Sequence, residues 1–308
     1  MAGVTHALLL TAGLGTRLQP LTTVRAKPAI PVAGEPMVRR IIRWLAASGV
    51  HTVVLNLHHL PQTITTIVGD GSDLGVRARY SWEQPAILGS AGGPRQALDI
   101  IGADRFLIVN GDTLTDVDLE ELVETHAATG ALATMAVVPN TRPDRYSGLR
   151  AEADRRVTGV EPKGSASPSW HFVGVQVVER AAFAELPAGR VLHSVGGTYD
   201  ALAAARPGSV RVHPCAARFW DIGTVADYWT THHVFAGRAD TPIASATRAH
   251  VTDSIVWDDV EFGDAAQVER SIVTDGVRVA PGAVHRDTIL IRGTRGHTVA
   301  VPLDLEQG

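Results

Sequence analysis

The chain has 308 residues, enough for two domains or for one large and one small domain, and 45% of them are apolar, as in a globular protein with a substantial core. The net charge of -4 argues against a general nucleic-acid-binding protein, and no apolar run reaches the roughly 18 residues that span a bilayer. The apolar stretch Ala7–Leu10 is too short for a signal peptide, and the single Cys215 can form neither an internal disulfide nor a zinc cluster. We therefore expect a cytoplasmic protein that binds neither nucleic acid nor membrane and holds no structural zinc.

Strands and helices are predicted to alternate along the first two thirds of the chain. Short apolar runs predict strands, and apolar residues at helical spacing predict helices. The predicted strands cover residues 5–11, 51–57, 76–82, 105–109 and 131–138. The predicted helices cover residues 37–47, 61–68, 92–100 and 118–128. This alternation predicts an α/β fold, with a Rossmann-like, mixed, mostly parallel sheet and helices on both faces, whose ligands bind at the C-terminal ends of the strands.

After about residue 237 the sequence changes to a repeat of 17 residues. Residues 254–260 recur at residues 271–277, and a third, partial copy begins at Thr288. Short β-branched runs at this period resemble a left-handed parallel β-helix. We therefore expect two domains, residues 1–237 and a short β-helix-like domain of residues 238–308. So few coils cannot bury their own faces, so we expect this tail to pack on the main domain or on another subunit of a homo-oligomer.

A loop rich in glycine and proline, residues 12–34, follows the first strand; we call it the phosphate loop. Its Gly13 and Gly15 let backbone N–H groups approach a polyphosphate closely, and Arg17 and Lys27 add positive charge. A Rossmann dinucleotide site would need a glycine where Leu18 stands, and the Gly-Lys-Ser/Thr of a Walker A loop is absent. The loop is therefore predicted to bind phosphate in neither of these two common ways.

Lysine is almost absent from this chain. Of the 28 basic residues, only Lys27 and Lys163 are lysines. A compact ammonium and a planar guanidinium are not equivalent where a phosphate is held at close range. Composition bias is the alternative explanation, and it weighs less for Lys27, which lies in the phosphate loop.

The phosphate loop resembles the signature of the sugar-1-phosphate nucleotidylyltransferases, the enzymes that make nucleotide sugars. The matching segments are AGLGTRL (residues 12–18), PLT (20–22), KP (27–28) and PVAGEP (31–36). Three further stretches match in order: Glu83 with LGSAG (88–92), NGD (110–112), and WDIGT (220–224), which is expected to open a helix. The resemblance covers about residues 5–236, and a β-helical tail follows in many relatives.

The resemblance implies a role for each of these positions. Nucleotide binding would fall to Ala12, Gly13, Gly15, Thr16, Arg17, Glu83, Leu88, Gly89 and Ser90. Sugar-phosphate binding would fall to Asn110, Gly148, Glu161, Lys163 and Gly174. Asp112 and Asp221 would hold Mg²⁺, although each alone could equally be a turn residue or a helix cap. The order Glu161-Pro162-Lys163 departs from the family's Glu-Lys-Pro, so Lys163 either binds the sugar phosphate from a shifted loop or is simply solvated.

The implied reaction is attack of a sugar-1-phosphate oxygen on the α-phosphorus of a nucleoside triphosphate, with release of pyrophosphate. The second pKa of a phosphate monoester is about 6, so the nucleophile is mostly dianionic at neutral pH and needs no general base. The main obstacle is repulsion between two anions, so catalysis must consist mostly of positioning and of cation supply. Arg17 would stabilise the β- and γ-phosphates, and Lys27 would bridge toward the α-phosphate.

The identity of the base and sugar stays open at this point. The tail and the LGSAG segment look like mannose-1-phosphate guanylyltransferases, which favours GTP and mannose 1-phosphate. Residues 69–72 and 79–81, with the missing Glu-Lys-Pro, look more like the uridylyltransferases for N-acetylmuramate 1-phosphate, which use UTP.

Two other classes of protein are weighed against this enzyme. A non-catalytic nucleotide-sugar-binding regulatory homologue is disfavoured, because Arg17, Lys27, Asp112 and Asp221 are all present. Acyl transfer on the tail is disfavoured, because its few coils carry no well-placed histidine.

Overall fold

The computed structural model describes residues 3–237 and 248–306, and the chain divides into two compact units. Unit 1 comprises Met1–Gly13 and Val38–Trp220, and unit 2 comprises Leu14–Met37 and Asp221–Gly308. The phosphate loop therefore changes units after Gly13. The domain boundary predicted between residues 237 and 238 adjoins residues 238–247, which lie outside the described residues, and it stays a prediction.

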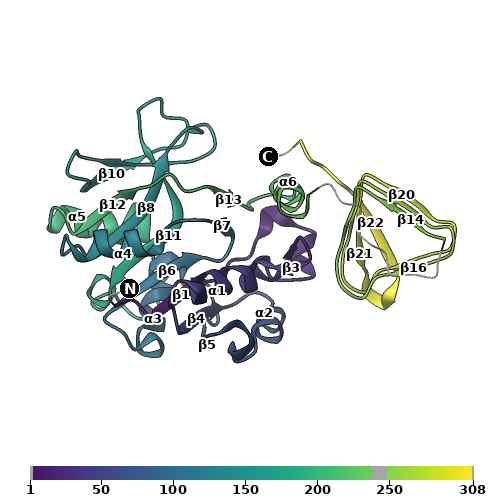
Figure 1. Ribbon diagram of the computed structural model, residues 1–308, viewed down its shortest axis with the longest axis horizontal. Helices are drawn as coiled ribbons and strands as arrows, with labels where there is room; N and C mark the ends of the chain where they lie inside the picture. The colour runs from purple at the N-terminus through teal and green to yellow at the C-terminus, as the bar shows by residue number, and fades with distance from the viewer. Residues whose placement is uncertain (1–2, 238–247, 307–308) are drawn as a thin grey trace. The chain divides into compact units, whose positions relative to one another are not determined.

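Unit 1 is built on a nine-stranded sheet, drawn from purple to green in Figure 1. Its strands are β1 (His6–Leu10), β4 (Thr52–Leu57), β5 (Arg77–Trp82), β6 (Arg105–Asn110), β8 (Ala133–Pro139), β9 (Gly148–Ala151), β10 (Val157–Glu161), β11 (Trp170–Glu179) and β12 (Val210–Pro214). The order is β10-β9-β11-β6-β1-β4-β5, and β8 pairs with both β11 and β12. Strands β5, β4, β1 and β6 run parallel, as do β8 and β12, whereas β11 runs antiparallel to its neighbours. The predicted mixed, mostly parallel sheet is confirmed.

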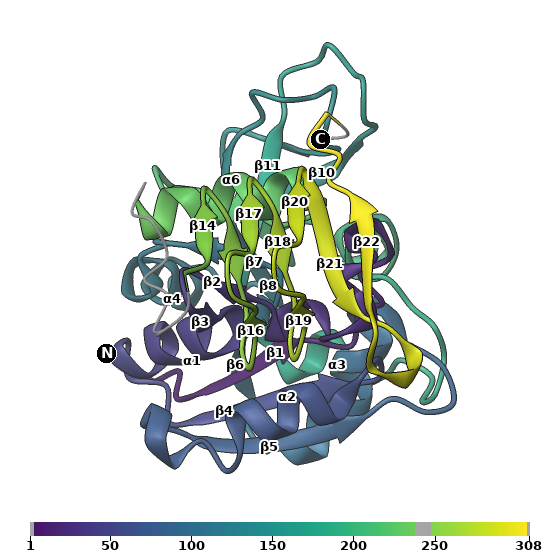
Figure 2. The same ribbon diagram turned by 90° about the vertical axis from the view of Figure 1, so that its right-hand side faces the viewer.

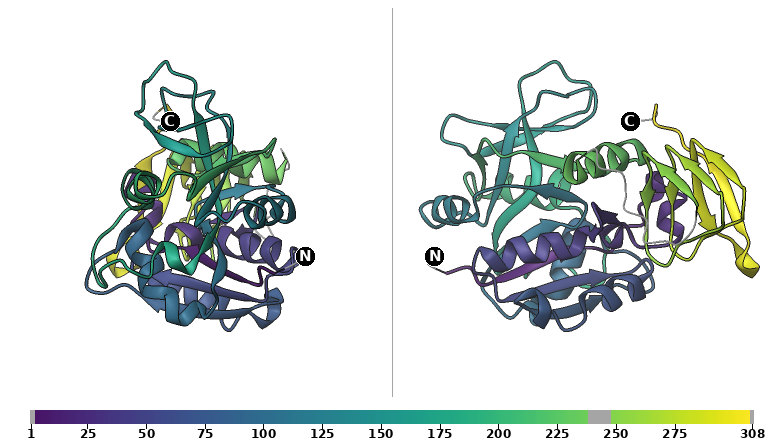
Figure 3. Two further views of the ribbon diagram at one scale, coloured as in Figure 1. Left: turned by 90° about the vertical axis from the view of Figure 1, so that its left-hand side faces the viewer. Right: turned by 45° about the vertical axis from the view of Figure 1, so that its right-hand side comes forward.

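The α-helices of the described residues are α1 (Met37–Ala47), α2 (Pro61–Val68), α3 (Gly89–Ile101), α4 (Leu119–Ala127), α5 (Tyr199–Ala205) and α6 (Val225–Ala236). Helix α3 packs on β1, β4 and β5, and α4 packs on β8 and β11 (Figure 3). The predicted bounds of α1 and α2 are confirmed. The prediction for α3 is wrong at its start, because residues 89–91 form the first turn of the helix and not a preceding loop.

Unit 2 combines most of the phosphate loop with α6 and the tail. A short hairpin, β2 (Pro31–Val32) and β3 (Glu35–Pro36), closes the loop segment. Two further short strands, β7 (Thr113–Thr115) in unit 1 and β13 (Phe219–Asp221), pair as a separate ribbon.

The tail forms stacked coils, which Figure 2 shows in green to yellow. Its strands are β14 (His250–Thr252), β15 (Ile255–Val256), β16 (Glu261–Phe262), β17 (Gln267–Glu269), β18 (Ile272–Val273), β19 (Arg278–Val279), β20 (Val284–Arg286), β21 (Thr288–Arg292) and β22 (Thr298–Pro302). Parallel pairs join residues 17 positions apart, such as Ile255 with Ile272 and Ile272 with Ile289. Inward apolar residues, including Val268, Val273 and Leu290, form one buried cluster. The β-helix-like tail is confirmed, and its last strand, β22, runs antiparallel to β21.

Within the described ranges, no helix combines the length and the apolar character that crossing a membrane requires.

Candidate active site

The carboxyl ends of three parallel strands meet at one edge of the unit 1 sheet. Leu10, the last residue of β1, pairs with Asn56 of β4 on one side and with Asn110 of β6 on the other. The Gly111 N–H donates to the Leu10 carbonyl at 2.9 Å. The start of the phosphate loop and the predicted metal ligand Asp112 therefore leave the sheet side by side, as the sequence predicts for an α/β ligand site.

Asn56 connects this edge to the predicted base-binding segment. Its Oδ1 accepts a hydrogen bond from the Thr11 N–H at 2.6 Å, and the Thr11 hydroxyl donates to the Asn56 carbonyl. The Asn56 amide Nδ2 donates to Glu83 Oε1 at 2.7 Å, and the Leu88 N–H donates to Glu83 Oε2 at 2.6 Å. One chain of hydrogen bonds thus links the turn after β1 to the turn before α3.

Glu83 is fully buried, with both carboxylate oxygens bound inside the protein. A Cβ on Gly93 would lie 2.4 Å from Glu83 Oε1, so only glycine fits beneath the carboxylate. The sequence predicts Glu83 as a nucleotide-binding residue, and this environment suits a carboxylate that positions residues 88–90. Sequence reasoning missed Asn56, because an asparagine at a strand end carries no motif of its own.

A second segment, residues 190–194, supports the first turn of α3. The Leu192 N–H donates to the Leu88 carbonyl, and the Leu192 carbonyl accepts from Ala91 at 2.9 Å. Gly89 has a φ of 77°, and a Cβ there would lie 2.5 Å from the Leu192 oxygen. The Ser90 hydroxyl accepts from the Ser194 N–H at 2.9 Å. Glycine is therefore required at residue 89, and backbone groups of the 88–90 turn are held at a fixed position.

The predicted sugar-phosphate residues fall into two groups. Gly174 has a φ of 81° and lies where the register between β11 and β8 shifts; a Cβ there would lie 3.0 Å from the side chain of Asn110. These two residues therefore lie together. Gly148 is buried against Ser169, while Lys163 is exposed in the turn after β10.

Glu161, at the end of β10, bonds inside its own loop. Its Oε2 accepts from the Ser165 hydroxyl at 2.8 Å, and its Oε1 lies 3.5 Å from Arg150 Nε. Both of these contacts are with residues other than Lys163, so the role of Lys163 stays a prediction.

An aromatic cluster forms around His171. The ring of His171 lies 4.1 Å from that of Tyr146 and 4.8 Å from that of Phe219, centroid to centroid. Burial, reinforced by the positive charge of Arg145, lowers the pKa of His171 to about 4. His171 is therefore neutral at neutral pH and serves as a packing group.

In unit 2, the phosphate loop folds back on itself at Gly15. This residue has a φ of 61°, and a Cβ there would lie 2.7 Å from Thr22 Cγ2 and 3.2 Å from Lys27 Cβ. The Thr22 hydroxyl donates to the Gly15 carbonyl at 2.9 Å. The backbone of Gly15 and the side chain of Lys27 are therefore neighbours, as a phosphate site built from both requires.

Arg17 lies against the N-terminal end of α6. A Cβ on Gly223 would lie 3.3 Å from the Arg17 Nη1 and 3.3 Å from Asp227 Oδ2. Thr224 caps the helix, in a capping box with Asp227. The segment WDIGT directly precedes α6, as predicted, but the alternative reading of Asp221 as the helix cap is wrong, because Asp221 belongs to β13 and the cap falls on Thr224.

The two predicted metal ligands are both partly exposed carboxylates. Asp112 lies in the turn after β6 in unit 1, and Asp221 is the first residue of unit 2. Within the described parts of the chain, no three His, Cys, Asp or Glu side chains converge as a metal cluster. Mg²⁺ is typically held by one or two carboxylates together with substrate phosphates and water, so the chemistry of each side chain fits the ion, and their role as its ligands stays a prediction.

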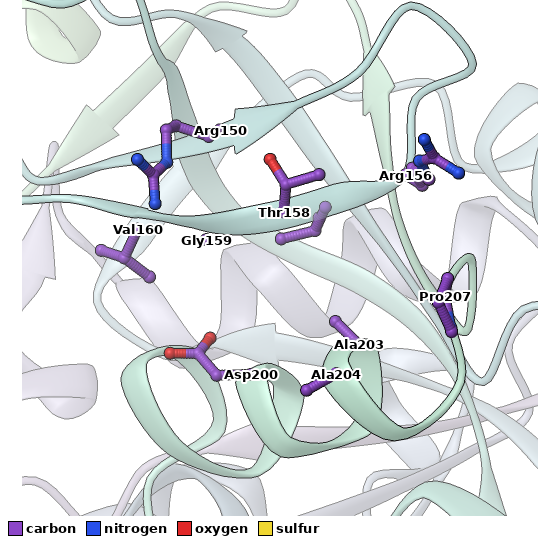
Figure 4. A pocket seen from close by; sticks show the side chains of 10 residues that line it. Arg150, Arg156, Thr158, Gly159, Val160, Asp200, Ala203, Ala204 and Pro207 are labelled. Atoms are coloured by element: carbon purple, nitrogen blue, oxygen red, sulfur yellow. The ribbon is translucent and has the colours of Figure 1, made fainter.

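A cavity of about 690 Å³ lies in unit 1 between β10 and α5 (Figure 4). Arg150 and Arg156 line its strand side and Asp200 its helix side. Both arginines pair with carboxylates, Arg150 with Glu161 and Arg156 with Asp154. None of the predicted site residues lines this cavity, so we assign it no part in the reaction.

Comparisons with known proteins agree with this arrangement. The family described as nucleotidyl transferase matches residues 6–236. The mannose-1-phosphate guanylyltransferase of Mycobacterium tuberculosis is 28% identical over 298 residues, covering 90% of this chain and 82% of that protein. The N-acetylmuramate alpha-1-phosphate uridylyltransferase of Neisseria meningitidis serogroup B is 33% identical over 189 residues, covering 60% of this chain and 80% of that protein.

Among solved structures, HddC from Yersinia pseudotuberculosis has a TM-score of 0.65 at 22% identity, covering 75% of this chain and all of that one, which supports the fold. Because the family match spans most of the chain, the protein belongs to the nucleotidyl transferase family, and its resemblance to the sugar-1-phosphate nucleotidylyltransferases is confirmed.

Proposed function

We propose that the protein transfers a guanylyl group from GTP to mannose 1-phosphate and releases pyrophosphate. The observation that carries this proposal is the similarity to a mannose-1-phosphate guanylyltransferase over 90% of the chain, which includes residues of the tail. The LGSAG turn, held by Glu83 and Leu192, supplies the backbone groups that would contact the base.

Different residues of the chain bind the triphosphate, the departing pyrophosphate and the metal ion. The phosphate loop, with Gly15 beside Lys27, binds the triphosphate, and Arg17 holds the departing pyrophosphate. Lys27 stabilises charge on the α-phosphate while the sugar-phosphate oxygen forms the new P–O bond and the bond to the β-phosphate oxygen breaks. Asp112 and Asp221 would hold Mg²⁺, which supplies positive charge against the phosphates when bound.

A second candidate is the UTP-dependent transfer to N-acetylmuramate 1-phosphate. A uridylyltransferase of that specificity is 33% identical to this chain, a higher identity than the guanylyltransferase shows, although over only 60% of the chain. The missing Glu-Lys-Pro order at residues 161–163 also favours this candidate.

A pyrophosphate-release assay distinguishes the candidates. Purified protein with Mg²⁺ is given each of the four nucleoside triphosphates against a set of sugar 1-phosphates that includes those of mannose, glucose and N-acetylmuramate. We expect the highest kcat/KM with GTP and mannose 1-phosphate. A preference for UTP and N-acetylmuramate 1-phosphate would favour the second candidate. Absence of turnover in every combination, with nucleotide-sugar binding retained, would favour a regulatory homologue.

A further inference from the structure

Arg25 lies in the phosphate loop two residues before Lys27, yet its side chain bonds carboxylates of the tail. The side chain is only 8% exposed. Its Nε and Nη2 donate to the two carboxylate oxygens of Asp275 at 2.6 and 2.7 Å. Nη2 also donates to Asp258, and Nη1 donates to the Ala29 carbonyl at 3.3 Å. Both acidic partners belong to the tail.

The two aspartates occupy the same position in successive coils. The pairing of Ile255 with Ile272 sets a register in which Asp258 stands beside Asp275. The Asp258 N–H donates to Asp275 Oδ1 at 3.2 Å, which ties the two coils together at this point. The 17-residue repeat therefore builds a two-carboxylate socket for a guanidinium, and Arg25 fills it.

A second connection runs from the tail to the other side of Lys27. The Trp257 ring lies under the Arg25 guanidinium, 5.5 Å from centroid to Cζ. The Trp257 Nε1 donates to the Tyr228 hydroxyl at 2.9 Å, and that hydroxyl donates to the Pro31 carbonyl at 2.8 Å. Tyr228 is fully buried, so this contact is sheltered from water.

The segment 27–30 is thus anchored at Arg25 by both coils and at Pro31, through Tyr228 of α6, by the first coil. We propose that Arg25 is a positioning residue, and that the Asp258–Asp275 socket fixes the backbone from which Lys27 reaches the α-phosphate. This inference rests on the proposed role of Lys27. By this inference the tail positions a residue of the phosphate site, in addition to any contribution to stability. A bidentate guanidinium–carboxylate pair fixes orientation as well as distance, which a solvated or apolar contact does not.

The test compares Asp275→Asn with Asp287→Asn in the full-length protein. Asp287 forms the same kind of contact between coils, with Arg270, and both of these side chains are about half exposed, whereas Asp275 bonds Arg25 of the phosphate loop. For Asp275→Asn we expect kcat to fall by about 10- to 100-fold, with the nucleotide Kd changed less than about threefold. For Asp287→Asn we expect near-normal kinetics. Asp275→Glu is expected to restore part of the lost kcat.

Amide hydrogen exchange separates this inference from the proposed function. Exchange in residues 21–33 should rise in Asp275→Asn and stay unchanged in Asp287→Asn, whatever substrate pair the enzyme uses. Raised exchange with normal kcat would overturn the positioning role, and equal effects of the two variants would overturn the socket. If Asp275→Asn does not fold, Trp257→Phe, which keeps the ring but loses the bond to Tyr228, is measured in the same way. Normal exchange and normal kcat in that variant would also count against the proposal.

Discussion

Single side chains in this protein hold together segments that are far apart in the sequence. Asn56 bonds Thr11 on one side and Glu83 on the other, so its amide links the residue after β1 to the base-binding turn. The amide group suits this place because it donates to one neighbour and accepts from the other, which neither a carboxylate nor an alkyl group does.

Replacing Asn56 by alanine should loosen nucleotide binding. The variant leaves the Thr11 N–H and Glu83 Oε1 without these partners, at a cost of about 1–3 kcal/mol for each unsatisfied buried group. We expect the nucleotide KM to rise about tenfold, with the sugar-phosphate KM little changed. Asn140→Ala, which removes an amide beside Gly148, should show the opposite pattern. Steady-state kinetics with each substrate varied in turn makes the comparison, and equal changes in both KM values would contradict it.

Lys27→Arg should be poorly tolerated although the charge is kept. Lys27 is 8% exposed and packed against Gly15, which leaves little room for a planar guanidinium. We expect kcat to fall about 10- to 100-fold with the melting temperature nearly unchanged. Near-normal kinetics would mean that the scarcity of lysine in this chain is compositional drift.

Asp112→Asn and Asp221→Asn should each abolish most turnover while the protein stays folded. Each change removes one carboxylate from the proposed Mg²⁺ site. Asp116→Asn is the matched control. Asp116 lies four residues after Asp112, and its carboxylate pairs with the exposed side chain of Arg218. Turnover and circular dichroism are measured at saturating Mg²⁺. Retention of more than about a tenth of the wild-type rate in either variant would refute the metal assignment.

At the scale of elements, the sequence predicts those helix bounds that depend on neighbouring residues in the chain. The bounds of α1 and α2 follow from apolar spacing and from Pro61 at a helix start. The start of α3 cannot be predicted in this way, because the sequence Gly-Ser-Ala-Gly is typical of a loop. In the structure, the carbonyl of Leu192, about 100 positions later in the chain, accepts hydrogen bonds from the N–H groups of Ala91 and Gly92.

The same limit applies to the site. Motif residues are visible in the sequence because each belongs to a short pattern. Arg25 is not, because its partners lie 233 and 250 positions away in the chain.

Deleting residues 238–308 should destabilise the protein. The truncation removes the carboxylates that Arg25 bonds and exposes the apolar surface of Tyr228 that Trp257 covers, and both losses destabilise unit 2. We expect a lower melting temperature or a changed oligomer, with residual nucleotide binding. Calorimetry and size-exclusion chromatography test this, and an unchanged melting temperature and oligomer would refute a stabilising role.

Across the whole molecule, buried histidines make stability depend on pH. Burial lowers the pKa of His6, His126, His171 and His213, in the case of His171 to about 4. Between pH 6.5 and that value the unfolded chain binds protons that the folded chain does not. Stability is therefore fully present above about pH 6.5 and is lost as the pH falls toward 4.

We expect the melting temperature to drop from pH 7 to pH 5, and His171→Phe to flatten that dependence. His250→Gln, at an exposed position of the tail, should leave the dependence as it is. Differential scanning calorimetry across this range is the measurement, and parallel curves for wild type and His171→Phe would contradict the assignment.

The 17-residue register of the tail also constrains how this protein can change in evolution. A duplicated coil placed after residue 275 would keep the 17-residue register and leave the socket of Arg25 intact. An inserted coil without an aspartate at this position, placed between Asp258 and Asp275, would separate the two carboxylates, and an insertion whose length is not a multiple of 17 would shift the register and turn apolar residues outward. Natural variation in tail length should therefore occur in whole coils and accumulate toward the C-terminal end, where β22 already departs from the repeat.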